Sequence, residues 1–232
     1  MAALRASLSL GPRVLEYTNG KLSLTQADKA VELLLSCSGR RCFTGVGKSG
    51  LAAQRMASSL TSIGERQRLL SPLFYLFLTR PPQRVSHAFS YLHTGLASHF
   101  VHGAEWAHGE YGGVGHGDVV TAVSHSGTTA ELLDLATRRR ELGRRDVTLI
   151  SLTGDAASPL ALAADVSLTA AVPAGAEAVH DLLPTASVLA AHHVFNALLC
   201  ECAARLELTP EDVRRHHPKG NVARRAADAA DQ

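Results

Sequence analysis

Two short turns in this sequence carry the residue types that bind phosphate. Gly45-Val46-Gly47-Lys48-Ser49-Gly50 fits the pattern G-x-G-x-x-G, in which close-packed backbone and a helix N-terminus hold an anion. Ser124-His125-Ser126-Gly127-Thr128-Thr129 combines hydroxyl groups with a glycine, so that many hydrogen bonds can surround a phosphate. The first turn alone fits a dinucleotide site or a phosphosugar site, and a P-loop is excluded because it would need glycine at Cys42. The second turn favours the phosphosugar site, since dinucleotide folds do not require it.

The elements around these turns are typical of a parallel α/β sheet, because short apolar runs alternate with helical patterns. Strands are predicted over residues 41–46, 118–124, 146–152 and 165–170, and a further strand leads to His108. Helices are predicted over residues 25–37, 48–63, 130–142 and 185–206, and a last short one begins at Thr209. Each phosphate-type turn therefore lies between a strand and a helix.

The composition indicates one ordinary domain without charge-driven partners. A chain of 232 residues that is 46% hydrophobic can build a sizeable core, and a formal net charge of +2 gives no reason to expect nucleic acid. No apolar run reaches the roughly 20 residues of a membrane helix, so we expect no membrane partner. The 12 histidines match no standard ligand spacing, so we expect no metal.

The spacing of the cysteines indicates the cellular compartment of the protein. All 4 lack the spacing of a metal site or of a secreted disulfide framework, which indicates free thiols in a reducing compartment such as the cytoplasm. The first 13 residues contain two arginines, two serines and no acid, which leaves organellar targeting as the alternative location.

Three more motifs accompany the two turns: His108-Gly109-Glu110, Leu152-Thr153-Gly154 and His217-Pro218. In this order the five motifs resemble those of the arabinose-5-phosphate isomerases, from residue 24 to residue 222 apart from 65–97. The resemblance implies a flavodoxin-like parallel sheet flanked by helices, the SIS domain, here in a short form without CBS modules. It also implies a homotetramer without cofactor or metal, which interconverts D-ribulose 5-phosphate and D-arabinose 5-phosphate, a precursor of the acid sugar KDO.

The resemblance also assigns roles to individual residues. The expected catalytic residues are Lys48, His108, Glu131, Glu177 and His217, the last of which reaches a neighbouring subunit. The expected phosphate-binding residues are Gly47, Ser49, Ser124, Ser126 and Thr129. An aldose–ketose isomerisation needs a base, a group that stabilises the enediolate oxygen and a hold on the remote phosphate. His217 or Glu177 fits the base, and Lys48 fits the group that stabilises the oxygen.

Some regions depart from the family pattern. Family members usually have Asn and Glu at the positions of His125 and Thr128, and residues 178–183 replace a characteristic Cys-Pro-Leu-Gly stretch. Residues 65–97 contain three prolines and no clean period, which predicts an irregular insertion. Two hypotheses explain it: a functional lid, or translation of a retained intron. We favour the intron, because the codons of Gly64-Glu65 permit a sequence that resembles a splice donor. Residues 1–23 are expected to be an N-terminal extension and residues 223–232 a frayed tail.

The sequence is also compatible with two other functions. SIS domains also serve as non-catalytic phosphosugar-binding modules, and related isomerases act on other phosphosugars such as a hexulose 6-phosphate. Lys48, His108 and His217 favour an enzyme, because binding alone does not need them. A nucleotide-dependent oxidoreductase based on the first turn is a more distant alternative.

Overall fold

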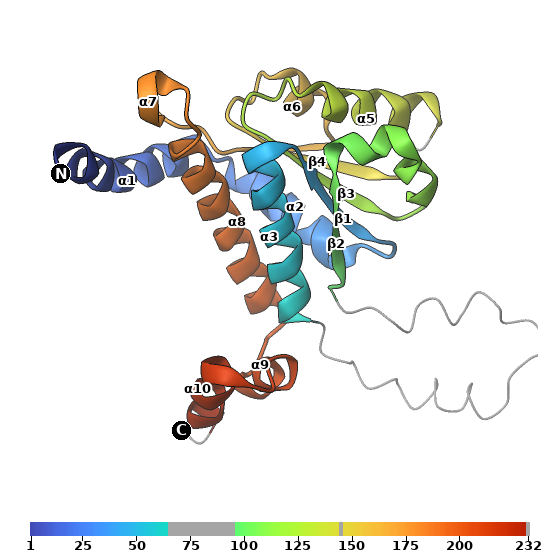
Figure 1. Cartoon of the computed structure of the whole chain (residues 1–232). Helices are drawn as coiled ribbons and strands as arrows, with labels where there is room; N and C mark the ends of the chain where they lie inside the picture. The colour runs from blue at the N-terminus through green and yellow to red at the C-terminus, as the bar shows by residue number, and fades with distance from the viewer. Residues whose placement is uncertain (65–95, 144–145, 231–232) are drawn as a thin grey trace, which may run out of the picture.

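The computed structural model describes residues 1–64, 96–143 and 146–230 (Figure 1). Within these residues, five parallel strands form one sheet in the order β2-β1-β3-β4-β5. The strands are β1 (Arg41–Gly45), β2 (Ser98–His102), β3 (Val119–Ser124), β4 (Thr148–Thr153) and β5 (Val166–Thr169). This is the flavodoxin-like order, in which the chain changes direction across the sheet between β1 and β3. The predicted fold class is confirmed.

Helices cover both faces of the sheet (Figure 1). One face carries α1 (Ala2–Lys21), α2 (Leu24–Ser36), α3 (Gly47–Ile63) and α8 (Ala186–Arg205). The other carries the 3₁₀ helices η2 (Gly103–His108) and η3 (Glu110–Gly113), with α5 (Ala130–Glu141) and α6 (Pro159–Ala163). The remaining helices are α7 (Ala178–Asp181), α9 (Pro210–His216) and α10 (Gly220–Ala230).

The alternation of side chains along β1 divides the interior into two cores. Phe43 faces the α3 and α8 side, where its ring meets Phe195 edge-on with the ring centroids 5.9 Å apart. Cys42 faces the opposite core, which contains Trp106 of η2 and the buried leucines of α5. Because β1 and β3 lie inside the sheet, every residue of both strands is buried, as expected for a parallel sheet covered on two sides.

The residues predicted as an N-terminal extension contain the long helix α1. Val14 and Thr18 are buried one helical turn apart, and the Thr18 hydroxyl donates a hydrogen bond of 2.8 Å to the carbonyl of Ala171. The first turns of α1 stay exposed, with Leu4 and Leu8 at the surface. The second half of α1 is therefore part of the core and packs on α8.

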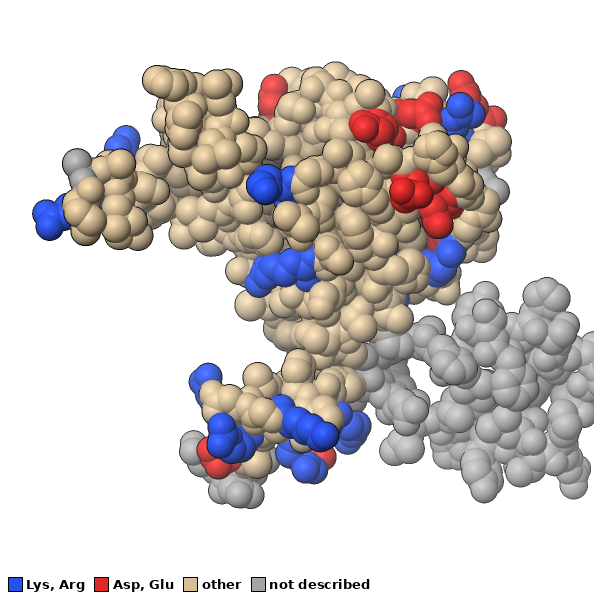
Figure 2. All heavy atoms as spheres, viewed as in Figure 1, with Lys and Arg blue, Asp and Glu red and all other residues tan. Residues whose placement is uncertain are grey.

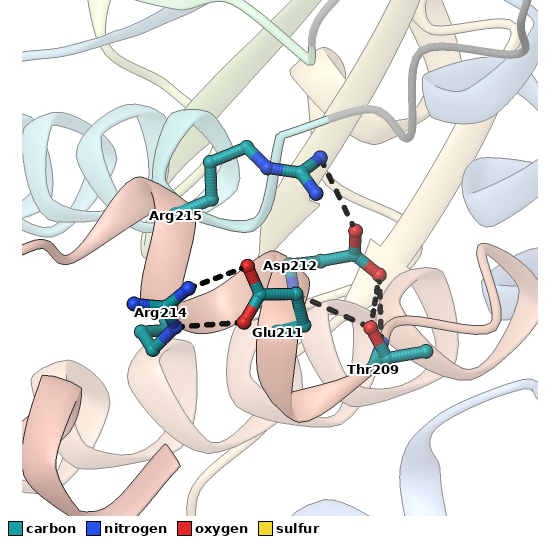
Figure 3. Close-up of polar contacts among 5 residues, drawn as sticks. All are labelled: Thr209, Glu211, Asp212, Arg214 and Arg215. Carbon is teal, nitrogen blue, oxygen red and sulfur yellow. Dashed lines mark hydrogen bonds and ion pairs between the residues drawn. The ribbon is translucent and has the colours of Figure 1, made fainter. Parts of the chain in front are cut away.

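Helix α9 begins at a reciprocal capping box (Figure 3). The Thr209 hydroxyl accepts a hydrogen bond from the backbone N–H of Asp212, and the Asp212 carboxylate accepts one of 3.0 Å from the backbone N–H of Thr209. Glu211 pairs with Arg214 and Asp212 with Arg215 on the same helix. The capping hydroxyl and proline predicted this start from the sequence.

The predicted fraying of residues 223–232 is wrong for residues 223–230, which belong to α10. Alanine is the best helix former, and Ala226 is buried where α10 meets α9. Packing of Ala226 against α9 therefore stabilises a helix that the charged residues of the tail did not suggest. Residues 231–232 lie outside the described part of the chain.

Helix α8 is, among the described residues, the one helix that is long and apolar enough to cross a membrane. It packs against α1, α2 and α3, and buries residues such as Ala190, Val194 and Phe195 in the core. The apolar composition of α8 is therefore explained by its central position between other helices.

The insertion predicted at residues 65–97 lies outside the described residues except for its last two. Of these, Leu96 is buried in the core beside β2. Both hypotheses for this segment, a functional lid or a retained intron, stay predictions, and sequencing the transcript would separate them.

A buried arginine at the start of β1 ties the strand to α2. The Arg41 guanidinium is almost fully buried and donates hydrogen bonds to the carbonyls of Leu34 and Cys37 at the end of α2. A cation at this end of a helix also interacts favourably with the helix dipole.

We expect Arg41→Met to lower the free energy of unfolding by about 2 kcal/mol, because it leaves buried carbonyls without their charged donor. Urea titration at pH 7 would measure the difference. Arg40→Met is the matched control: its guanidinium is half exposed, 3.4 Å from Asp118, and the buried Asp118 carboxylate keeps its hydrogen bonds from the backbone N–H groups of residues 40 and 115, so a smaller loss is expected. Equal losses in the two variants would contradict the capping role of Arg41.

Candidate active site

The two phosphate-type turns open onto one cavity of about 330 Å³ at the carboxyl ends of the strands. They meet because β1 and β3 are neighbours, with Gly45 opposite Val123 in the sheet. The polar side chains that line the cavity are Lys48, Ser49, Ser124, His125, Ser126, Thr129, Thr153, Glu177, Asp181 and Ser187. Ligands of open α/β sheets bind at this edge, where the chain changes direction.

Two helices begin at the cavity without a capping side chain. The residues before α3 and α5 are Val46 and Thr129, and neither side chain accepts a hydrogen bond from the first turn of its helix. Backbone N–H groups and the positive end of the helix dipole therefore face the cavity from two directions. This arrangement suits an anionic group such as a phosphate.

Hydrogen bonds inside the second turn fix its hydroxyl groups. The Ser124 and Thr129 hydroxyl oxygens lie 2.8 Å apart, and the Ser124 hydroxyl accepts a hydrogen bond from the backbone N–H of Gly127. The Ser126 hydroxyl accepts hydrogen bonds from the N–H and the hydroxyl of Thr128. The turn is thus organised before a ligand arrives, which lowers the entropic cost of binding.

Gly127 has to be glycine for this turn to form. Its φ of +63° lies in the left-handed region, and a Cβ atom there would stand 2.2 Å from the hydroxyl oxygen of buried Ser158. Gly47 in the first turn has a similar φ of +59°, at the start of α3. Both glycines allow the backbone conformation of their turns, but neither lines the cavity, so the phosphate-binding role predicted for Gly47 stays a prediction.

Lys48 supplies positive charge to the cavity. Its side chain is exposed, lines the cavity and makes no ion pair within the part of the chain that the structure describes. The ammonium group is therefore available to an anionic substrate. An ammonium group can neutralise either a phosphate or an oxygen that becomes negative during a reaction.

Glu177 lies at the cavity but caps a helix. Its carboxylate accepts hydrogen bonds from the backbone N–H groups of Ala186 and Ser187, at 2.8 and 3.0 Å, and from Thr185. Burial acts to raise the pKa of Glu177, but hydrogen bonds from Ser187, Thr185 and Ala186 outweigh it and hold the pKa below its usual value. A carboxylate of low pKa is a weak proton acceptor at neutral pH. The geometry therefore favours Glu177 as an oriented, ionised group at the start of α8.

We expect Glu177→Gln to lower the free energy of unfolding at pH 7 by about 1 kcal/mol, because a charged cap at a helix N-terminus is lost. A carboxyl group whose pKa is depressed by folding stabilises the protein above its unfolded pKa and loses this effect as the pH falls through its folded pKa. The wild type should therefore lose its advantage over the variant below about pH 4. Urea titrations at pH 7, 5 and 3.5 measure this, and an advantage that is constant across them would contradict the capping role.

Asp181 is a cavity residue that the sequence did not single out. Its carboxylate accepts hydrogen bonds from the backbone N–H groups of Gly175 and Glu177. The three residues Val179, His180 and Asp181 all have positive φ, between 52° and 63°, although none is glycine. Such a conformation costs on the order of 1 kcal/mol or more per residue. His180 and Asp181 are residue types that adopt it more often than most, whereas Val179 is not.

Three of the predicted catalytic residues lie outside this cavity. His108 is exposed at the end of η2, and Glu131 is exposed in the first turn of α5. His217 follows α9, with Nδ1 3.2 Å from the carbonyl oxygen of Val213. One chain thus brings together Lys48, Glu177, Ser49, Ser124, Ser126 and Thr129, but not these three.

The position of His217 is at the far end of α3 from Lys48. Helix α9 packs near the last turn of α3, where the His216 ring lies against Gly64, whereas Lys48 is in the first turn (Figure 1). A helix of 17 residues is about 25 Å long. His217 therefore cannot reach the cavity of its own chain in this conformation.

Comparison with known proteins identifies the family. Residues 86–200 match the SIS domain. Over 198 residues the chain is 37% identical to the arabinose 5-phosphate isomerase KdsD of Pseudomonas aeruginosa, covering 85% of this chain and 50% of that protein. It is 26% identical to the arabinose 5-phosphate isomerase KpsF of Escherichia coli, covering 97% of this chain and 58% of that protein.

A solved structure shares the fold over nearly its whole length. An Escherichia coli CFT073 protein in complex with arabinose 5-phosphate superposes with a TM-score of 0.71 at 27% identity, covering 94% of this chain and 96% of that one. The chain spans about half the length of the curated relatives it matches. Within the described residues no group of three potential metal ligands occurs. The chain therefore contains an SIS domain and is similar to the arabinose 5-phosphate isomerases.

Proposed function

We propose that the protein is an aldose–ketose isomerase that interconverts D-ribulose 5-phosphate and D-arabinose 5-phosphate through an enediolate. The observation that carries this proposal is the cavity in which Lys48 faces a preorganised, hydroxyl-rich turn between two open helix N-termini. Similarity to arabinose 5-phosphate isomerases, at up to 37% identity, supports the choice of substrates. The product would supply KDO synthesis in the cytoplasm.

In this proposal one part of the cavity binds the phosphate and another part holds the carbon atoms that react. The phosphate is held by Ser124, Ser126 and Thr129, together with the first N–H groups of α5. In the forward direction a base removes a proton from C1 of the ketose, and the carbonyl oxygen at C2 becomes the enediolate oxygen. Proton return to C2 and transfer of a hydroxyl proton from O1 to O2 give the aldose. Lys48 stabilises the negative oxygen in between.

We assign the base to His217 of a second copy of the chain, in a homotetramer. Histidine suits proton transfer near neutral pH, and Glu177 is hydrogen-bonded as a helix cap. Lys and Arg side chains gather on the α9–α10 lobe that carries His217 (Figure 2). A basic segment beside an anionic substrate would assist its binding.

The test is to incubate the purified full chain with D-ribulose 5-phosphate and follow D-arabinose 5-phosphate by ¹³C NMR. Conversion that approaches the same equilibrium from either sugar is the expected result. A hexulose 6-phosphate in the same assay tests the substrate class, and preferred turnover of it would replace the proposed substrates. Lack of turnover with every phosphosugar would contradict the proposal.

One observation favours a second candidate, a phosphosugar-binding module without activity. The cavity of one chain assembles the phosphate-binding turn but holds neither His108, Glu131 nor His217. Under this alternative, calorimetry would detect D-arabinose 5-phosphate binding to a protein that turns nothing over.

A further inference from the structure

We propose that His125 makes the affinity of this cavity for phosphate depend on pH, because its protonated ring binds the phosphate group. The inference rests on the proposed function in one respect, namely that the ligand is a phosphosugar. His125 stands between Ser124 and Ser126 in the second turn and lines the cavity with them. The imidazole is therefore part of the group of side chains that would surround a phosphate.

The ring has a defined position against the loop that follows β4. The carbonyl of His125 accepts a hydrogen bond of 2.8 Å from the N–H of Gly154. A Cβ atom at Gly154 would stand 2.5 Å from Cε1 and 2.6 Å from Nδ1 of the His125 ring. The absence of a side chain at Gly154 thus leaves the space that the ring occupies, and His125 stays exposed at the cavity.

No acid neutralises His125 within the described residues, since none lies within ion-pair distance of its ring. The charged groups that share the cavity are Lys48 from α3, Asp181 from α7 and Glu177 before α8. Both carboxylates accept hydrogen bonds from backbone N–H groups. On the adjoining loop, the Asp155 carboxylate accepts one from Ala157. A protonated His125 therefore finds its counter-ion in the ligand.

The direction of the effect follows from general titration behaviour. A phosphate monoester has a second pKa of about 6 and is a dianion above pH 7, whereas imidazole changes its charge between about pH 5 and 8. Ordinary carboxylates titrate below this interval and ammonium groups above it. Under this proposal the affinity should therefore fall as the pH rises from 6.5 to 8.5.

The experiment is calorimetric titration of the full chain with D-arabinose 5-phosphate and, separately, inorganic phosphate at pH 6.5, 7.5 and 8.5. For the wild type we expect the Kd to rise by up to about tenfold from pH 6.5 to 8.5, because one hydrogen bond between charged groups is lost. His125→Asn should bind weakly with a nearly constant Kd. His125→Lys, which keeps a cation throughout, should bind tightly with a nearly constant Kd. His116→Asn alters an exposed histidine paired with Asp146 outside the cavity and should behave as the wild type.

The same pH dependence in His125→Asn as in the wild type would overturn the inference, and so would a wild type that binds neither ligand. Isomerase activity measured on the same samples separates this inference from the proposed function. Turnover with a Kd that does not depend on His125 would contradict the inference alone. A pH-dependent Kd that is lost in His125→Asn, without turnover by the wild type, would contradict the proposed activity alone.

Discussion

Lys48→Met is expected to lower kcat/KM for D-ribulose 5-phosphate by about 10²–10³-fold, because the variant lacks the cation that we propose stabilises the enediolate oxygen. Methionine keeps the length and the apolar stem of lysine but removes its charge. Since Lys48 makes no ion pair within the described residues, its replacement should leave the free energy of unfolding nearly unchanged. Initial rates over a range of substrate concentrations would measure kcat and KM separately.

Whether the lower kcat/KM of Lys48→Met comes from kcat or from KM distinguishes two roles for Lys48. A loss in kcat means that the ammonium group acts mainly in the transition state, whereas a rise in KM alone means uniform binding of the phosphate. Lys29→Met removes an exposed lysine on α2, far from the cavity, and serves as the control. Activity of Lys48→Met within threefold of the control would contradict the assigned role.

The fold was predictable because local sequence and packing agree along most of the chain. The helix predicted over residues 130–142 is Ala130–Glu141, and the strand predicted over 118–124 is Val119–Ser124. The strand is a buried apolar run that ends at the turn rich in glycine and hydroxyl groups, and the helix begins at the end of the same turn. Parallel strands then place both turns at one sheet edge, which is why these two turns could be predicted from the sequence as parts of one candidate site.

The rest of the site depends on contacts between residues that no spacing reveals. The conformation of Val179, His180 and Asp181 follows from its surroundings rather than from a glycine, so the approach of Asp181 to the cavity left no signal. Glu177 was placed at the site by resemblance, but its capping of α8 appears only when residues 177 and 185–187 come together. Helix α1 was missed because its burial depends on α8, which lies more than 160 residues later.

The position of His217 at the far end of α3 leads to a prediction about assembly. If His217 of one chain acts as the base in the cavity of another, His217→Ala should lower kcat by about 10²–10⁴-fold. His216→Ala, next to it in the sequence, is the matched control and should keep most of the activity. The Kd for D-arabinose 5-phosphate should change little in either variant, because the phosphate-binding turn belongs to the other chain.

Mixing two inactive variants tests this arrangement directly. When Lys48→Met and His217→Ala chains are co-expressed, a cavity with Lys48 from one variant can receive His217 from the other. With equal amounts, random assembly and one donor chain per cavity, about one quarter of the cavities contain both residues, so about one quarter of wild-type activity should return. Native mass spectrometry would establish that mixed oligomers have formed. Mixed oligomers without recovered activity would show that His217 does not complete the cavity of a neighbouring chain, because each variant supplies the residue that the other lacks.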